Sequence, residues 1–161
     1  FQLIGQDNLR RYLPVQYLRI RVHPDDSLFD ICARVCAARA AGCRITVGLP
    51  THFESPAITV VEQLTDGWAG AIEFVEESDT HLAEAIVGRQ TDRVRYASPT
   101  RVPLTIHHAA AETGLFVASA PVLPVGRVEL LWYVREQSVC SDYHRYGNLG
   151  SRAEEPRSEP A

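Results

Sequence analysis

Apolar positions along this chain follow two rhythms, a two-residue period and a helical one. Between residues 15 and 22 apolar and polar side chains alternate, which predicts a strand with one buried face. Helical spacing follows: Ser27 is an N-cap with Asp30 three positions on, as in a capping box, and Gly42 ends the helix. The same succession then repeats, with strands predicted at residues 44–47, 71–75, 92–96, 115–120 and 127–134, and helices at residues 55–64, 78–87 and 103–113.

Strands separated by single helices form βαβ units, and such units build a mostly parallel sheet. The pattern therefore predicts an α/β fold of the Rossmann-like, doubly wound class. We expect a Rossmann-like domain over residues 1–138 and a C-terminal docking motif over residues 139–152. Residues 153–161 are polar and proline-containing, which predicts a disordered tail.

The segment after residue 131 is unusually rich in aromatic side chains mixed with arginine and hydrogen-bonding groups. This composition is typical of a surface that contacts another protein element. The alternative is a terminal strand and tail folded back onto their own domain. The candidate docking residues in this segment are Asp142, Tyr143, His144, Arg145, Tyr146, Gly147 and Asn148, with Asp142 able to pair with Arg145 or with an arginine of a partner.

Two stretches of the chain resemble a known family. The motif EQSVCSDYHRYGNLG at residues 136–150, with RVELLWYVR before it, resembles the C-terminal motif of the long bifunctional proline utilization A flavoenzymes. GQDNLRRY at residues 5–12 and HPDDSLFDICARVCAARAAGCRITV at residues 23–47 resemble the opening of the extra C-terminal domain of those enzymes. A chain that begins at Phe1 and contains no Met also fits a fragment of a longer protein.

The resemblance implies a function for the whole polypeptide and a different one for this domain. The parent would be a proline dehydrogenase and L-glutamate gamma-semialdehyde dehydrogenase that uses FAD and NAD. The domain would resemble an aldehyde dehydrogenase nucleotide-binding domain that has lost its cofactor and has no catalytic residue. It would pack on the aldehyde dehydrogenase domain of the same polypeptide and help enclose the channel for the pyrroline-5-carboxylate/semialdehyde intermediate. Gln6, Asp7, Asn8 and Arg10 match the N-terminal motif, a polar crossing from the preceding domain, and the first three would join the docking residues.

Composition narrows the classes of partner. A net charge of −4 and a pI near 5.9 argue against nucleic acid, and no apolar run reaches the ~18 residues of a membrane span. All sixteen basic residues are arginine, which excludes lysine-dependent chemistry. The four cysteines form no disulfide framework, and free thiols fit a cytoplasmic protein. Cys32 and Cys36 are expected to be buried, with no metal bound.

Many Rossmann-like sheets bind a dinucleotide, so the turns after the strands indicate whether this chain can bind one. Phosphate binding needs glycine where a strand leads into a helix. Asp25 and Asp26 stand there after the first strand, and Gly48 is followed by Glu54 after the second. The third turn contains Glu76 and Glu77, which we expect to be solvated. These acidic, glycine-poor turns predict that this chain binds no cofactor.

No nucleophile motif is present, since the chain lacks G-x-S-x-G, and Cys43 leads into a buried strand, where we expect a structural role. Two further functions stay open. One is an NAD-binding domain of an aldehyde dehydrogenase-like oxidoreductase, which the acidic turns oppose. The other is a self-association module in which the aromatic tail pairs two copies.

Overall fold

The structure is a computed structural model that describes residues 5–68, 70–144 and 148–154. The chain divides into two compact units. One unit comprises residues 14–134 and is called here the α/β unit. The other comprises residues 1–13 and 135–161, and the described part of it is called here the ribbon.

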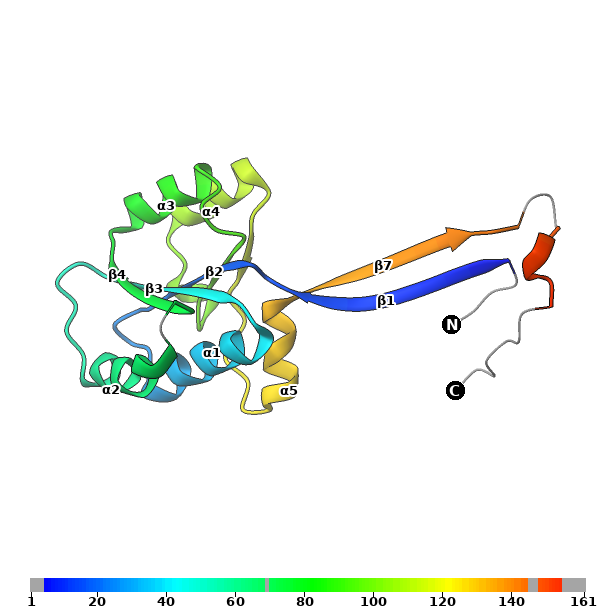
Figure 1. The fold of residues 1–161 in the computed structure, drawn as a ribbon. Helices are drawn as coiled ribbons and strands as arrows, with labels where there is room; N and C mark the ends of the chain where they lie inside the picture. Colours follow the sequence, from blue (N-terminus) through cyan, green and yellow to red (C-terminus); the bar gives the residue numbers. More distant parts are fainter. Residues whose placement is uncertain (1–4, 69, 145–147, 155–161) are drawn as a thin grey trace. The chain divides into compact units, whose positions relative to one another are not determined.

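The α/β unit is built on a five-stranded parallel sheet (Figure 1). The strand order is β4-β3-β2-β5-β6, so the chain builds one half of the sheet outward from β2 and then crosses to the other half. This arrangement confirms the Rossmann-like α/β class. The strands are β2 (Tyr17–Arg21), β3 (Arg44–Leu49), β4 (Ile72–Glu76), β5 (Arg93–Arg95) and β6 (Phe116–Ala118), and the helices between them are α1 (Leu28–Ala41), α2 (Pro56–Thr65), α3 (Asp79–Val87) and α4 (Leu104–Thr113).

Local capping signals fix the helix ends where the sequence predicted them. Ser27 accepts from the backbone N–H of Asp30, and the Asp30 carboxylate accepts from the N–H of Ser27, which completes the capping box of α1. Gly42 ends α1 in the left-handed conformation. The side chains of Ser55 and Ser78 accept from the N–H groups of Ala57 and His81 at the starts of α2 and α3.

Helices cover both faces of the sheet (Figure 1). On one face, α1 and α2 pack over β2 and β3, and the main core lies there around Leu18, Ile20 and Ile45. On the other face, α3 and α4 pack together and enclose a smaller core with Leu82, Ile86 and Ile106. Burial on two sides explains why the central strands are rich in branched apolar residues.

The strand predicted at residues 127–134 is wrong. The chain forms a short helix α5 (Gly126–Glu129) and a 3-10 helix (Leu130–Tyr133) there instead. Glu129 and Tyr133, four residues apart, both point into the core, and the Tyr133 hydroxyl donates to the Glu129 carboxylate at 2.8 Å. A short apolar run fits a strand or a buried helix equally well, and in the helical conformation the Glu129 carboxylate is buried with Tyr133 and Arg95 as its partners.

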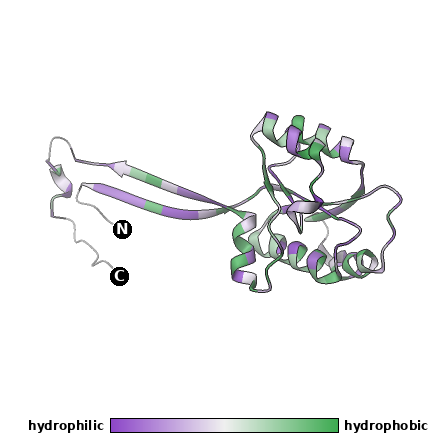
Figure 2. Cartoon of the chain, turned by 180° about the vertical axis from the view of Figure 1, so that it is seen from behind, coloured by the Kyte–Doolittle hydropathy of each residue, from purple (hydrophilic) through white to green (hydrophobic). Residues whose placement is uncertain are grey.

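The ribbon contains two strands that the sequence did not predict. β1 (Gln6–Pro14) and β7 (Val134–Asp142) form a two-stranded sheet. Gln6 contacts Asp142 and Arg11 contacts Gln137, so the two strands are antiparallel. Hydrophobic and hydrophilic residues are interleaved along both strands (Figure 2), and most of their side chains are exposed.

Two shorter 3-10 helices complete the elements used below, at Pro99–Arg101 in the α/β unit and at Gly150–Arg152 in the ribbon. A third lies at Asp66–Trp68. Within the described part of the chain, no helix combines the length and apolar character needed to cross a bilayer. Residues 155–161 of the expected disordered tail lie outside the described residues.

Candidate functional site: a filled switch point and a polar ribbon end

The switch point of the sheet lies between β2 and β5, where the direction of winding reverses. Open α/β sheets bind their ligands at the carboxyl ends of the strands at this point. In this chain the two carboxyl ends are Arg21 and Arg95. The side chains gathered around them therefore decide whether a cofactor fits.

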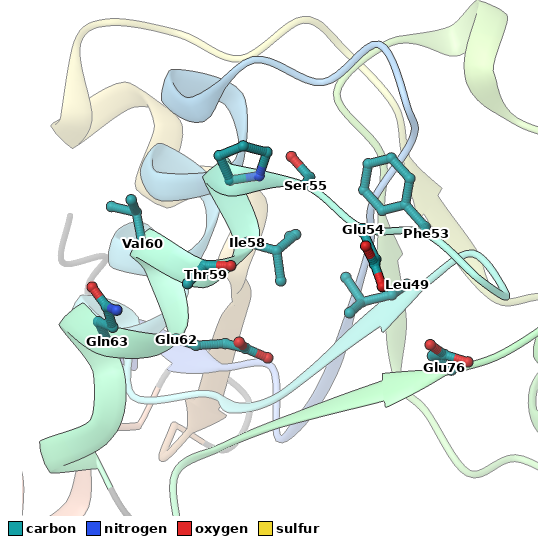
Figure 3. A pocket seen from close by; sticks show the side chains of 11 residues that line it. Leu49, Phe53, Glu54, Ser55, Ile58, Thr59, Val60, Glu62, Gln63 and Glu76 are labelled. Carbon is teal, nitrogen blue, oxygen red and sulfur yellow. The ribbon is translucent and has the colours of Figure 1, made fainter.

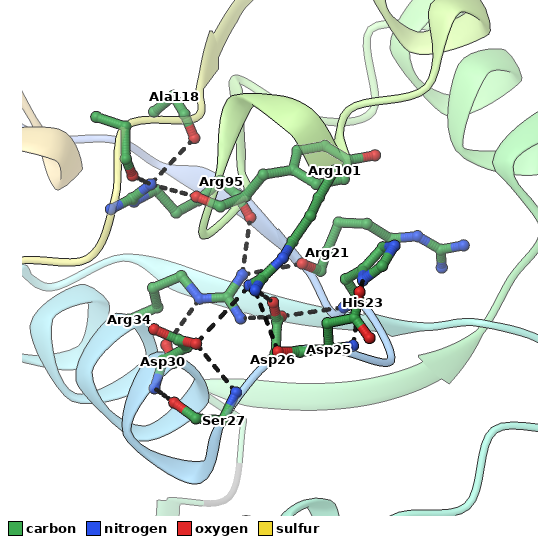
Figure 4. Close-up of polar contacts among 12 residues, drawn as sticks. Arg21, His23, Asp25, Asp26, Ser27, Asp30, Arg34, Arg95, Arg101 and Ala118 are labelled. Carbon is green, nitrogen blue, oxygen red and sulfur yellow. Dashed lines mark hydrogen bonds and ion pairs between the residues drawn. The ribbon is translucent and has the colours of Figure 1, made fainter.

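A guanidinium from α1 occupies this position. Arg34 Nη1 donates to the backbone oxygen of Arg21 at 2.9 Å and to that of Arg95 at 3.4 Å, and so bridges the two strand ends (Figure 4). Its Nε donates to the oxygen of Asp30 at 2.8 Å, and the side chain is completely buried. Burial lowers the pKa of Arg34, while the charge of Asp26 opposes that shift.

Asp26 supplies the charge that compensates these arginines. Its carboxylate, fully buried, accepts from Arg34 Nη2 and from Arg101 Nη1, each at 2.5 Å, and from the N–H of His23 at 3.0 Å (Figure 4). We expected Asp26 to repel an incoming phosphate from the helix end. The structure shows a different role, in which Asp26 is the internal partner of two guanidinium groups.

Gly48, the glycine of the second turn, makes room for a carboxylate. A Cβ atom at Gly48 would lie 2.1 Å from Oε1 of Glu77. Glu77 pairs with Arg19 at 2.5 Å, and its backbone oxygen accepts from Arg21 Nη1 at 2.9 Å. The expectation that Glu77 is solvated is wrong, since the residue is buried, and this burial raises its pKa against the opposing charge of Arg19 and Arg21.

A second buried ion pair lies beside β5. Arg95 Nη2 donates to Glu129 at 2.8 Å, and both side chains are buried. Arg95 Nη1 donates to the backbone oxygen of Ala120 at 2.6 Å, and Glu129 also accepts from the N–H of Leu123 at 3.0 Å. These charges are held by several hydrogen bonds each, which suits a structural role rather than proton transfer.

A wider groove of about 990 Å³ runs along α2 and the ends of β3 and β4 (Figure 3). Glu54, Glu62 and Glu76 line it together with apolar residues such as Phe53 and Ile58, and none of its lining residues is basic. An acidic wall of this kind disfavours the phosphates of a nucleotide.

The ribbon brings together candidate residues from both ends of the chain. Gln6 Nε2 donates to Asp142 Oδ1 at 2.7 Å, and the N–H of Tyr143 donates to the oxygen of Gly5 at 2.9 Å. His144 Nδ1 lies 3.0 Å from the same oxygen. Gly5 has a φ of +83°, and a Cβ there would lie 2.6 Å from His144 Nδ1, so this turn requires glycine.

Sequence reasoning missed Arg152, which ties the two ends together. It pairs with Asp7 at 2.9 Å, and its guanidinium lies 3.9 Å from the ring centre of Tyr143, within the range of a cation–π contact. The only sequence signal for it was an arginine next to the aromatic motif. Asp7 and Tyr143 thus converge on one side chain.

The remaining candidates have simpler surroundings. Asn8 donates to Gln6 Oε1 at 3.1 Å, and Asn148 Oδ1 accepts from the N–H of Gly150 at 2.9 Å. Arg10 pairs with Glu136 at 3.1 Å in an exposed contact. The candidates Arg145, Tyr146 and Gly147 lie outside the described residues.

The cysteines differ from one another in their surroundings. Cys43 is buried, its thiol lies 3.4 Å from the backbone oxygen of Tyr133, and burial raises its pKa to about 11. Cys32 is half-buried and Cys36 exposed, so the expectation that both are buried is wrong. Ala37 and Ala38 take the buried positions on α1 instead. Over the described ranges, no three His, Cys, Asp or Glu side chains are grouped to hold a metal.

Comparison with known proteins yields no family model and no curated protein that matches this chain. Among solved structures, the chain is similar to Proline Utilization A (PutA) from Corynebacterium freiburgense, with 27% identity and a TM-score of 0.52. That match covers 91% of this chain and 11% of the PutA chain. Histidinol dehydrogenase from Elizabethkingia anophelis matches with 18% identity and a TM-score of 0.52, over 77% of this chain and 30% of the dehydrogenase.

These similarities show a dehydrogenase-related fold. The histidinol dehydrogenase match speaks for the fold alone. The PutA match extends over nearly the whole of this chain, although the chain spans only about a ninth of that protein.

Proposed function

We propose that this chain is a non-catalytic domain of a longer polypeptide that oxidises proline to glutamate. The observation that carries the proposal is the PutA match, which includes nine-tenths of this chain and a small part of the PutA chain. In the proposal, the parent polypeptide contains proline dehydrogenase and L-glutamate gamma-semialdehyde dehydrogenase domains, with FAD and NAD bound there. The ribbon packs on the aldehyde dehydrogenase domain and helps enclose the channel for the intermediate.

The filled switch point supports the absence of catalysis in this domain. A pyrophosphate needs free backbone N–H groups and net positive charge near the first helix. Arg34 instead donates its hydrogen bonds to the backbone oxygens at the strand ends and to Asp26. The buried carboxylate of Asp26 lies next to the start of α1. A dinucleotide would have to displace an internal ion pair, which costs several kcal/mol.

The ribbon supports docking because two strands are not a self-sufficient structure. An isolated two-stranded sheet is marginally stable in water, and each strand has one edge without a neighbouring strand in the described sheet. Leu9, Tyr12, Leu13 and Val139 are exposed along it. Large apolar side chains on an unpaired edge fit a surface that another protein element covers.

Removal of residues 139–161 from the full-length enzyme tests the proposal. Proline oxidation with an artificial electron acceptor should be unchanged, because its active site lies in another domain. NADH formation from proline should show a lag, because the intermediate would escape before the second reaction. A matched enzyme that lacks only residues 153–161 should show no lag.

An unaltered time course of NADH formation after removal of residues 139–161, with normal aldehyde dehydrogenase activity, would contradict the channel role.

The same ribbon surface favours self-association as a second candidate function. Mass measurement of the isolated chain with and without residues 139–161 separates the two, since only self-association predicts a dimer that the truncation abolishes. Saturable binding of NAD at micromolar concentration in a calorimetric titration would support the remaining alternative, a functional NAD-binding domain.

A further inference from the structure

The groove along α2 and the ends of β3 and β4 combines carboxylates with apolar side chains. Its volume of about 990 Å³ is at the upper end of small-molecule sites, so it has room for a larger occupant. Glu54 lies in the loop before α2, Glu62 on α2 and Glu76 at the end of β4, and all three are exposed. Figure 3 shows them around the buried residues Leu49 and Ile58. The groove therefore has an acidic rim and an apolar floor.

The three carboxylates of the groove are not neutralised by the protein. Among the residues that the structure describes, none of these side chains has an ion-pair or hydrogen-bond partner. Elsewhere in the α/β unit, the side chains of Asp26, Glu77 and Glu129 are each paired with arginine. Between Arg44 and Arg89 the sequence contains eight Asp and Glu residues and no Arg or Lys. The negative charge of the groove is therefore available to a partner of positive charge.

The outer side of α2 adds apolar surface beside the groove. Pro56, Val60 and Leu64 follow one another at intervals of four residues, so they lie on one side of the helix. Val60 is 38% and Leu64 67% exposed, and Val60 also lines the groove. The core contacts of α2 are made by other residues, Ile58 and Val61. An exposed apolar row next to unneutralised carboxylates is typical of a surface that contacts another protein.

We propose that this groove docks an amphipathic helix of a partner protein, with arginine on one side of that helix and apolar residues on the other. The arginines pair with Glu54, Glu62 and Glu76, and the apolar side chains contact Phe53 and Val60. Arginine suits the site because its planar guanidinium donates two parallel hydrogen bonds to a carboxylate. The ten residues of α2 extend over ~15 Å, which two to three turns of a partner helix can span. The inference does not depend on the docking of the ribbon, because the α/β unit contains every residue used.

Fluorescence anisotropy of a labelled helical peptide tests the site. The probe carries three arginines and three leucines on opposite sides, and it is titrated with the 161-residue chain. Binding should saturate, and it should weaken at least about tenfold between about 50 mM and about 500 mM salt. A peptide with alanine in place of the leucines should bind at least about tenfold more weakly, because it loses the apolar contacts. The absence of saturable binding, or equal affinity of the leucine-free peptide, would overturn the proposal.

Glu54→Gln combined with Glu62→Gln is the decisive variant, because both residues are exposed and the change should leave the fold intact. It should bind the peptide roughly fivefold more weakly. Glu84→Gln combined with Glu112→Gln, at exposed positions on α3 and α4, changes the net charge equally and should bind as the unaltered chain does. Unchanged affinity in the groove variant, or equal weakening in both variants, would refute the site. Mass measurement showing a dimer that only the groove variant abolishes would identify a second copy of the chain as the occupant and would also refute the proposal.

Discussion

The α/β unit and the ribbon differ in how far their paired charged side chains are exposed to solvent. In the α/β unit, the side chains of Asp26, Arg34, Arg95 and Glu129 are buried, and each pairs with another charge in the unit. In the ribbon, the side chains of the Arg10–Glu136 pair are 70% and 51% exposed, respectively. Neighbouring apolar side chains are exposed as well. The first pattern belongs to a unit that is complete by itself. The second belongs to a surface that has room for a partner.

The α/β unit combines a dehydrogenase-related fold with buried ion pairs at its switch point. A dehydrogenase-related sheet normally leaves its switch point open for a cofactor. Here the Arg34 guanidinium donates to the backbone oxygens at the ends of β2 and β5. The Glu77 carboxylate fills the space that a side chain at Gly48 would need. Structural similarity to dehydrogenases therefore describes the fold, which by itself does not fix a function.

The largest expected effect tests the buried charges. Asp26→Asn should lower the free energy of unfolding by about 3–5 kcal/mol, because Arg34 would remain buried with less compensating charge. Glu136→Gln in the ribbon is the control and should cause no measurable change, since the pair that it breaks is solvated. Urea denaturation measures both. Equal stability of the two variants would remove the contrast between the two regions.

Thiol reactivity should differ next most strongly. With a pKa of about 11, Cys43 has roughly 0.1% thiolate at pH 8, and its fraction rises about tenfold per pH unit up to the pKa. Cys140 in the ribbon is exposed. Iodoacetamide should therefore label Cys140 at least about a hundredfold faster, as followed by mass spectrometry. Comparable rates at the two cysteines would show that the core around Cys43 opens readily.

A smaller and local effect is expected at the end of the ribbon. Gly5→Ala forces a side chain into a left-handed backbone conformation and against His144, at a cost of about 1–2 kcal/mol. Hydrogen exchange of the Tyr143 amide, which donates to Gly5, should accelerate roughly 5- to 30-fold. Gly67→Ala, which meets no atom within 4 Å, is the control. An unchanged Tyr143 rate would mean that this end is open already.

Local signals in the sequence predicted the elements that depend on them. Ser27 with Asp30, and Gly42 after the helix, act within a few residues, and the structure places α1 between them. The parallel pairing of the sheet strands followed from the βαβ succession, but their order in the sheet was not predicted. The prediction failed at residues 127–134, where Glu129 is buried against Arg95, more than thirty residues away.

The candidate sites were predictable only in part, for the same reason. The acidic turn was visible, but the pairing of Asp26 with Arg101 joins residues 75 positions apart. Strand β1 is largely polar and gave no signal, because its conformation depends on pairing with β7 at the other end of the chain. Nonlocal pairing of this kind leaves no periodic trace in a single sequence.

Hydrogen exchange of the isolated chain and of the full-length polypeptide, compared amide by amide, tests the central claim most directly. If the ribbon is a docking element, amides of residues 6–13 and 135–142 exchange quickly in the isolated chain and are strongly protected in the full polypeptide. The core strands β2 and β3 should exchange equally slowly in both, since the α/β unit is complete by itself. Ribbon amides that exchange at the same rate in both proteins would contradict the account.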